Sequence, residues 1–155
     1  MATLQDVLET APLFSGFIDS DLAALAGALR PRELKAGECL FRQGQAGDSM
    51  TIVVSGEFGV FAQNDGQERV KLATIRPGDV VGEMSAIDPA PRSATVEATT
   101  TSKAYILDRS MLSALQVNAA GMYTALLRGI GNAVTRRLRQ TNESILDATF
   151  GSKRL

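Results

Sequence analysis

The chain of 155 residues is long enough for one domain with one hydrophobic core, since domains most often contain about 100–150 residues. Its 45% apolar residues, 21% charged residues and net charge of −1 exclude a disordered chain and a fibrous repeat. It contains no histidine and one cysteine, Cys39, which excludes most acid–base and zinc catalysis and any disulfide within the chain. We therefore expect a cytoplasmic protein that holds neither a metal nor a cofactor.

The first 30 residues are predicted to form helices. Apolar residues recur with helical spacing from Leu4 to Leu29, and Asp19 or Ser20 is expected to cap a second helix that ends before Pro31. The N-terminus has neither a basic start nor an apolar run, and no stretch approaches the ~18 apolar residues of a membrane span. We expect no export signal and no membrane partner.

Residues 31–108 are predicted to form a β-sandwich or barrel of seven or eight strands. Glycines divide this region into short apolar runs, a spacing typical of many short strands joined by tight turns. Apolar residues alternate at 58–62, 70–72 and 94–98, as they do in half-buried strands. Asn64-Asp65-Gly66 has the composition of a hairpin turn.

Helices are predicted again after Asp108, a short one at 109–116 and a long one from about 119 to 147. A helix of about 28 residues extends roughly 40 Å, too far for one barrel to cover. Its apolar stripe is therefore expected to join a second copy in a homodimer, with packing on the chain's own barrel as the alternative. Gly129 and Gly131 would mark a kink or a close helix crossing. The stripe comprises Leu127, Ile130, Val134, Leu138, Thr141 and Ile145.

The basic residues gather near the C-terminal end of the chain. Residues 118–155 carry six basic and two acidic side chains, and Arg136, Arg137 and Arg139 form a cluster among them. Three arginines on one helix are more typical of a solvated face or a dimer edge than of a nucleic-acid site, in a chain whose pI is near 5.5. We expect no nucleic-acid partner.

The segment 82–96 carries the most informative chemistry. A short helix beginning near Glu83 would offer free backbone N–H groups, and Arg92 adds a fixed charge with five donors, so together they would hold a phosphate. Glu83 only accepts hydrogen bonds when ionised, which suits a sugar hydroxyl beside that phosphate. The segment therefore predicts a ribose phosphate site. A mutual surface salt bridge between Glu83 and Arg92 is the alternative.

This segment resembles the phosphate-binding cassette of cyclic nucleotide-binding domains, in which Gly-Glu is followed nine residues after the glutamate by Arg-Ser-Ala-Thr-Val. Residues 37–57 are similar to the early strands of that barrel, and 136–143 is similar to the dimerisation helix of catabolite activator protein-like sensors. The resemblance covers about residues 10–147. It implies a mainly β domain over 1–155, a double-stranded β-helix (jelly-roll) barrel at 31–108 with helices at 1–30 and 109–147 and a tail at 148–155.

The resemblance also implies the roles of the cassette residues. Glu83 would accept from the ribose 2′-hydroxyl, and Arg92 would pair with the cyclic phosphate. Serine at position 93 favours cAMP, with cGMP as the alternative ligand. Backbone or small groups facing the phosphate and sugar would come from Gly82, Met84, Ser85, Ser93 and Ala94.

Contacts to the base are implied in two places. On the barrel they are Val60, Leu72 and Ala73, for which burial in the core is an equal alternative. On the long helix they are Thr141, whose hydroxyl would meet the adenine amino group, and Asn142, supplied by the partner subunit. For this pair the alternative is a polar interruption of the apolar stripe.

The function implied is that of a non-catalytic sensor that binds a cyclic nucleotide and signals through its C-terminal helix to an effector protein. Relatives that bind DNA carry a helix-turn-helix after the long helix, whereas eight residues follow Asp147, so no DNA-reading module is expected. A degenerate domain that serves protein–protein contact without ligand is the alternative. An enzyme on a similar barrel, such as a metal-dependent cupin, would need the histidine ligands that the chain lacks.

Overall fold

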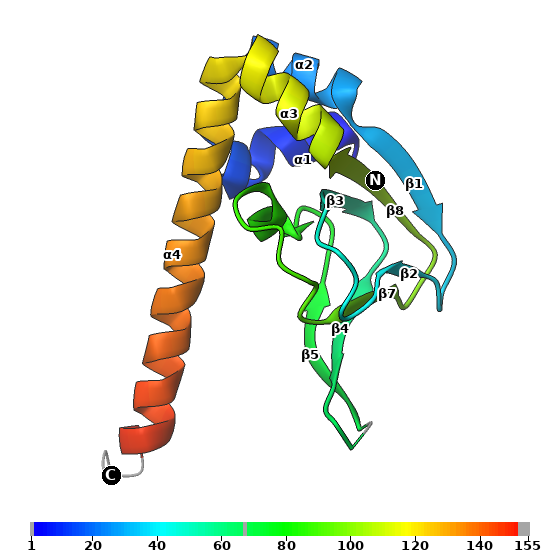
Figure 1. Ribbon diagram of the computed structural model, residues 1–155, viewed down its shortest axis with the longest axis vertical. Coiled ribbons are helices and arrows are strands. Elements are labelled where there is room, and N and C mark those ends of the chain that lie inside the picture. The colour runs from blue at the N-terminus through cyan, green and yellow to red at the C-terminus, as the bar shows by residue number, and fades with distance from the viewer. Residues whose placement is uncertain (1, 67, 152–155) are drawn as a thin grey trace.

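The computed structural model describes residues 2–66 and 68–151, in which eight antiparallel strands form two sheets flanked by helices (Figure 1). Helices from both ends of the chain gather on one side, and the last helix runs alongside the barrel (Figure 1). The helical elements are α1 (Leu4–Thr10), the 3-10 turn η1 (Pro12–Phe14), α2 (Asp19–Ala28), the 3-10 turn η2 (Glu83–Ala86), α3 (Arg109–Asn118) and α4 (Ala120–Phe150). The strands are β1 (Arg30–Leu34), β2 (Cys39–Phe41), β3 (Ser49–Ser55), β4 (Phe58–Gln63), β5 (Arg69–Ile75), β6 (Val80–Val81), β7 (Thr95–Ala98) and β8 (Ser102–Asp108).

The two sheets confirm the predicted jelly-roll barrel. One has the strand order β1-β8-β3-β6 and the other β2-β7-β4-β5, so strands distant in sequence lie side by side. The predicted hairpin at 64–66 joins β4 to β5.

Two apolar cores share strand β3, which is buried on both faces. Met50 and Ile52 pack with the helices, while Val53 points into the space between the sheets, as the alternation of a strand requires. The inter-sheet core is led by Phe58 and Leu34. The helical core fixes the N-terminal helices, α3 and the start of α4 against the barrel, and so determines where α4 begins.

The predicted cap of α2 is wrong. The helix begins at Asp19 itself, and Ile18 occupies the N-cap position without a side-chain hydrogen bond. Asp19 and Asp21 lie in the first turn, where the positive end of the helix dipole stabilises carboxylates. The preceding helix is capped by its side chains, because Thr3 and Asp6 form a capping box.

The long helix begins one residue later and ends three residues later than predicted, and it has two different halves. In the first half Leu126 and Ile130 are buried, and a side chain at Gly129 would overlap the backbone of Leu13 in η1, so this glycine permits a close crossing. Gly131 has open space around it and marks no close crossing.

The single apolar stripe predicted for this helix divides between these halves. Ile130 is buried and Val134 packs against the helical core, but Leu138 is 59% exposed and Ile145 57% exposed. Packing on the chain's own barrel therefore accounts for only the first half of the stripe. No helix within residues 2–66 and 68–151 is long and apolar enough to cross a membrane.

Candidate functional site

The predicted cassette begins with a single 3-10 turn, η2. Gly82 precedes it with a φ of 73°, and a Cβ there would lie 2.8 Å from the Ser49 carbonyl oxygen. Only glycine adopts this left-handed conformation without strain and also leaves room for the neighbouring strand. The predicted short helix beginning near Glu83 is confirmed, as a 3-10 turn of four residues.

Arg92 is buried at the centre of the cassette, with 8% of its surface exposed. Its guanidinium donates to Ser85 Oγ (2.9 Å), to the Ser49 carbonyl oxygen (2.7 Å) and to Ser49 Oγ (3.1 Å), and it lies over the ring of Phe41 at 3.9 Å from the ring centroid. Arg92 Nε is buried and has no hydrogen-bond partner among the described residues. The cation thus has one buried N–H group without an acceptor among the described residues.

The electrostatic environment of Arg92 contains two opposing effects. Burial lowers the pKa of its guanidinium, because a charged group loses solvation in the interior. The carboxylates of Asp48 and Glu83 act in the opposite direction and favour the charged form. The arginine remains a cation held in a poorly solvated place, where an incoming negative charge is attracted more strongly than at the surface.

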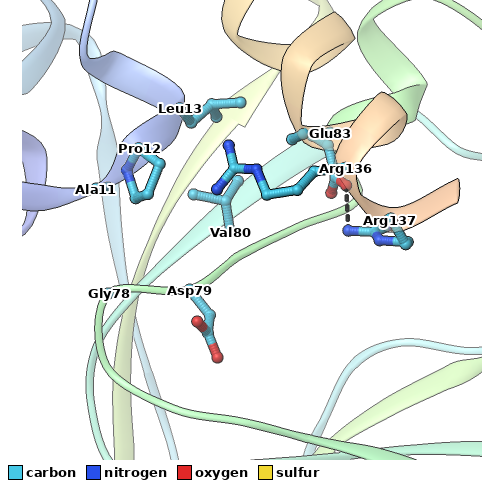
Figure 2. A pocket seen from close by; sticks show the side chains of 10 residues that line it. Ala11, Pro12, Leu13, Gly78, Asp79, Val80, Glu83, Arg136 and Arg137 are labelled. Carbon is cyan, nitrogen blue, oxygen red and sulfur yellow. Dashed lines mark hydrogen bonds and ion pairs between the residues drawn. The ribbon is translucent and has the colours of Figure 1, made fainter. Parts of the chain in front are cut away.

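Glu83 is also buried, 4% exposed, and its partner lies on the long helix. Arg137 of α4 donates to Glu83 Oε1 at 2.7 Å, the contact drawn as a dashed line in Figure 2. The alternative of a surface salt bridge between Glu83 and Arg92 is therefore wrong, because both are buried and the glutamate pairs elsewhere. Arg137, expected on a solvated face or a dimer edge, has a side chain that is 59% exposed and also links α4 to the cassette.

A cavity of about 140 Å³ adjoins this ion pair. In Figure 2 the side chain of Arg136 extends from α4 toward Leu13 and Val80, so three parts of the fold meet here. The walls are formed by Ala11, Pro12, Leu13, Gly78, Asp79, Val80, Glu83, Ala133, Arg136 and Arg137.

The remaining predicted cassette residues differ in exposure. Ser85 and Ala94 are buried, whereas Ser93 is exposed and Met84 is 49% exposed. The structure therefore brings Gly82, Glu83, Ser85 and Arg92 together at one place.

A second loop, residues 42–48, supports the cassette and was not predicted to do so. Arg92 N donates to the Gln45 carbonyl oxygen and Gly44 N to the Arg92 carbonyl oxygen, each at 2.8 Å. A Cβ at Gly47 would lie 2.6 Å from the Ala90 carbonyl oxygen, so this glycine permits the two loops to touch. Gly44 and Gly47 indicated a tight turn in the sequence. The segment that this turn contacts, Ala90 to Arg92, is 43 or more residues away and could not be identified from the spacing.

The expected base-binding residues on the barrel lie on β4 and β5. Val60 and Ala73 are directly opposite each other and share one face of the sheet, as do Ala62 and Val70. A bulge between these pairs adds Leu72 as an extra residue on β5, and this side chain is 60% exposed. Ala62 and Val70 were not predicted as site residues, although their alternation was visible.

The expected base-binding residues on α4, Thr141 and Asn142, are exposed. Thr141 Oγ1 donates to the Arg137 carbonyl oxygen at 3.0 Å, and no hydrogen bond joins either residue to the barrel within the described part of the chain. Across residues 2–66 and 68–151, no three His, Cys, Asp or Glu side chains gather as a metal site requires.

The sequence pattern of the family described as "Cyclic nucleotide-binding domain" matches residues 31–118, which is more than half of the chain and includes the whole cassette. The chain belongs to the cyclic nucleotide-binding domain family. This membership confirms the resemblance and the fold that were inferred from the cassette.

Relatives of this cyclic nucleotide-binding domain include bacterial regulators and a kinase subunit. The chain is 32% identical over 148 residues to the CRP-like cAMP-activated global transcriptional regulator of Mycobacterium tuberculosis, covering 95% of the chain and 64% of that regulator, less than two thirds of its length. The N-terminal domain of a Streptomyces coelicolor transcriptional regulator superposes with a TM-score of 0.75 at 35% identity, covering 91% of the chain and 96% of that domain. The regulatory domain of Toxoplasma gondii PKA, solved with cAMP, gives a TM-score of 0.66 at 32% identity over 72% of the chain and 42% of that structure.

Proposed function

We propose that the chain is a non-catalytic sensor that binds cAMP in the cassette, with cGMP as the alternative ligand. The observation that carries the proposal is Arg92, a buried guanidinium whose Nε–H has no partner among the described residues. A buried polar group without a partner is costly, so it points to a ligand that supplies the missing acceptor. A cyclic phosphate carries one negative charge and oxygens that suit this donor.

The ribose is proposed to bind at Glu83. A carboxylate has two oxygens and about four acceptor positions, and Arg137 uses only Oε1. The remaining oxygen can accept from the ribose 2′-hydroxyl while the ion pair persists. Ser85 and the exposed Ser93 would add hydroxyl groups beside the phosphate, and Gly82, Met84 and Ala94 would add backbone groups.

The base is proposed to lie between β4–β5 and α4. Ala73 is exposed and Leu72 is 60% exposed, which favours pocket lining over simple burial for these two, whereas Val60 is half-buried against the inter-sheet core. Thr141 would meet the base from the same chain, and Asn142 from a second copy.

The signal is proposed to leave through α4. Arg137 joins this helix to Glu83, so a ligand that changes the environment of Glu83 also changes a contact of α4. Beyond Arg137 the helix exposes an apolar surface led by Leu138 and Ile145, which we assign to a homodimer and, through it, to an effector protein. Under this proposal the domain is a sensor that binds a nucleotide and does not transform it.

Titration calorimetry of the wild-type protein with cAMP and with cGMP tests this proposal. Arg92→Ala should weaken cAMP binding about 30- to several-thousand-fold, because it removes the charge partner of a buried phosphate. Arg69→Ala is the matched control, since Arg69 also lies over a phenylalanine ring and pairs with Glu97 outside the cassette. Hydrogen exchange on the same samples should show new protection of residues 134–146 with cAMP.

Two outcomes would contradict the proposal. Wild-type protein that binds neither nucleotide would favour the degenerate domain that serves protein contact alone. Binding without any change in exchange across 134–146 would retain the ligand but remove α4 as the route of the signal.

A further inference from the structure

We propose that Phe41, which lies outside the cassette, is a positioning residue that fixes the tilt of the Arg92 guanidinium for the phosphate. The inference rests on the proposed function, because it assigns a role in that same site. The two side chains come from different elements and are 51 positions apart in the sequence. Their contact is a cation–π pair with the guanidinium carbon 3.9 Å from the ring centroid.

The backbone holds Phe41 beside Arg92. Phe41 ends β2, where the pairing with β7 shifts register between Cys39 and Phe41, and such an irregularity re-aims a side chain. Three residues later Gly44 N donates to the Arg92 carbonyl oxygen, and Arg92 N donates to Gln45. The ring and the guanidinium are therefore anchored by the same short stretch of backbone.

The hydrogen bonds of Arg92 leave one degree of freedom for Phe41 to control. A guanidinium is planar and makes its hydrogen bonds within that plane. Ser49 and Ser85 accept such bonds and fix the rotation of the guanidinium within its own plane. They restrain its tilt weakly, because two of the three acceptors are hydroxyls that rotate. The ring of Phe41 lies against a face of the group and sets the tilt.

Tilt matters because a phosphate bound to a guanidinium lies in the same plane and accepts from its edge. A change of tilt moves the free Nε–H away from that plane and weakens every contact at that edge together.

A second stack on the same barrel shows what burial adds. Arg69 lies 3.8 Å from the ring of Phe61, so the geometry is nearly the same, but its side chain is 43% exposed. Water competes for an exposed cation, whereas Arg92 is 8% exposed and has little other solvation on that face. The Phe41 contact should therefore be the stronger of the two.

The experiment measures cAMP affinity by calorimetry in the wild type, Phe41→Leu and the matched control Phe61→Leu. Phe41→Leu keeps an apolar side chain but removes the ring, and should weaken binding about two- to thirtyfold, whereas Phe61→Leu should bind as the wild type does. Replacing Phe41 by phenylalanines with one, two and three ring fluorines should weaken binding stepwise at nearly constant size, which a purely structural role would not do.

Two further readouts separate positioning from packing. The loss caused by Phe41→Leu should vanish when Arg92 is already replaced by Gln, because the residue acts through the cation. The loss caused by 2′-deoxy-cAMP, which reports Glu83, should be equal in the wild type and in Phe41→Leu. In NMR spectra of the ligand-free protein, the Arg92 Nε–H should show an upfield ring-current shift that Phe41→Leu removes.

The outcomes distinguish the inference from the function on which it rests. Wild-type affinity in Phe41→Leu, or an undiminished loss in the Arg92→Gln background, would overturn the positioning role and leave the proposed function intact. A wild-type protein that shows the ring-current shift but binds no cyclic nucleotide would overturn the proposed function, and the positioning role with it.

Discussion

Asp108 ends β8 and begins α3, and its side chain does more than one task at this junction. It accepts from Ser110 Oγ (2.7 Å) and from Met111 N (3.0 Å) as the N-cap of α3, and it forms an ion pair with Arg30. The hydrogen bond from Ser110, then that from Met111, and then the charge of Arg30 hold the pKa of this carboxyl below its usual value of 3.8.

The sign of this shift predicts how stability depends on pH. Because the folded-state pKa of Asp108 is depressed, its contribution is fully present above about pH 4, the ordinary carboxyl range, and is lost as the pH falls through the folded-state pKa. Asp108→Ala should cost about 0.5–2 kcal/mol of unfolding free energy at pH 7 and progressively less below pH 4. Urea unfolding at several pH values measures this difference in unfolding free energy, with Ser113→Ala, at an exposed position of α3, as the control. A constant difference at every pH would contradict the assignment.

At the scale of single residues, the sequence indicated part of the candidate site. Gly82, Glu83 and Arg92 were identified because their chemistry and spacing lie within one short segment. Arg137 and Phe41 were not, since each meets the cassette from more than 50 positions away and carries no local signal. Residue type alone does not say which of three neighbouring arginines pairs with Glu83.

Among the elements, α4 offers a matched pair of glycines for a stability test. A Cβ at Gly129 would overlap the Leu13 carbonyl in η1, whereas a Cβ at Gly131 meets open space. Gly131→Ala should stabilise the protein by about 1 kcal/mol, because alanine loses less backbone entropy in a helix. Gly129→Ala should destabilise it despite the same gain in helix propensity, because α4 and η1 must separate. Thermal unfolding of both variants checks the opposite signs, and equal signs would contradict the close crossing.

Element types were predictable from periodicity, whereas several boundaries were not. The strands of 31–108 follow from alternation and glycine spacing, and the described part of this range contains eight of them. The cap of α2 was missed because Ile18 carries no capping side chain, so the start of the helix is fixed by packing of Leu22 and Leu25 instead. The apolar stripe predicted that α4 is a helix, but it did not predict what the stripe packs against. The spacing of apolar residues is the same whether a helix packs on its own barrel or on another chain.

The whole molecule presents α4 as a helix of 31 residues, about 46 Å long, of which the second half is exposed. Four large apolar side chains in this half are between 54% and 59% exposed. Exposed apolar side chains that gather on one element in this way are typical of an interaction surface. Those residues are Leu138, Ile145, Leu146 and Phe150.

We therefore expect the wild type to sediment as a dimer at micromolar concentration and Leu138→Glu as a monomer, because two facing copies would bring like charges together. Ser144→Glu adds the same charge about 120° around the helix and should leave the dimer intact. A monomeric wild type, or dimers in both variants, would contradict dimerisation through the face of α4 that carries Leu138.

The ion pair between Arg137 and Glu83 would couple nucleotide binding in the cassette to self-association through α4. Under the proposed function, one carboxylate takes part in nucleotide binding and also anchors the helix on which self-association depends. Linkage is then reciprocal: whatever factor the nucleotide applies to the association constant, association applies to the affinity for nucleotide. The apparent affinity of the sensor would therefore vary with its own concentration, so that abundance, as well as the level of the second messenger, sets the fraction of occupied sites.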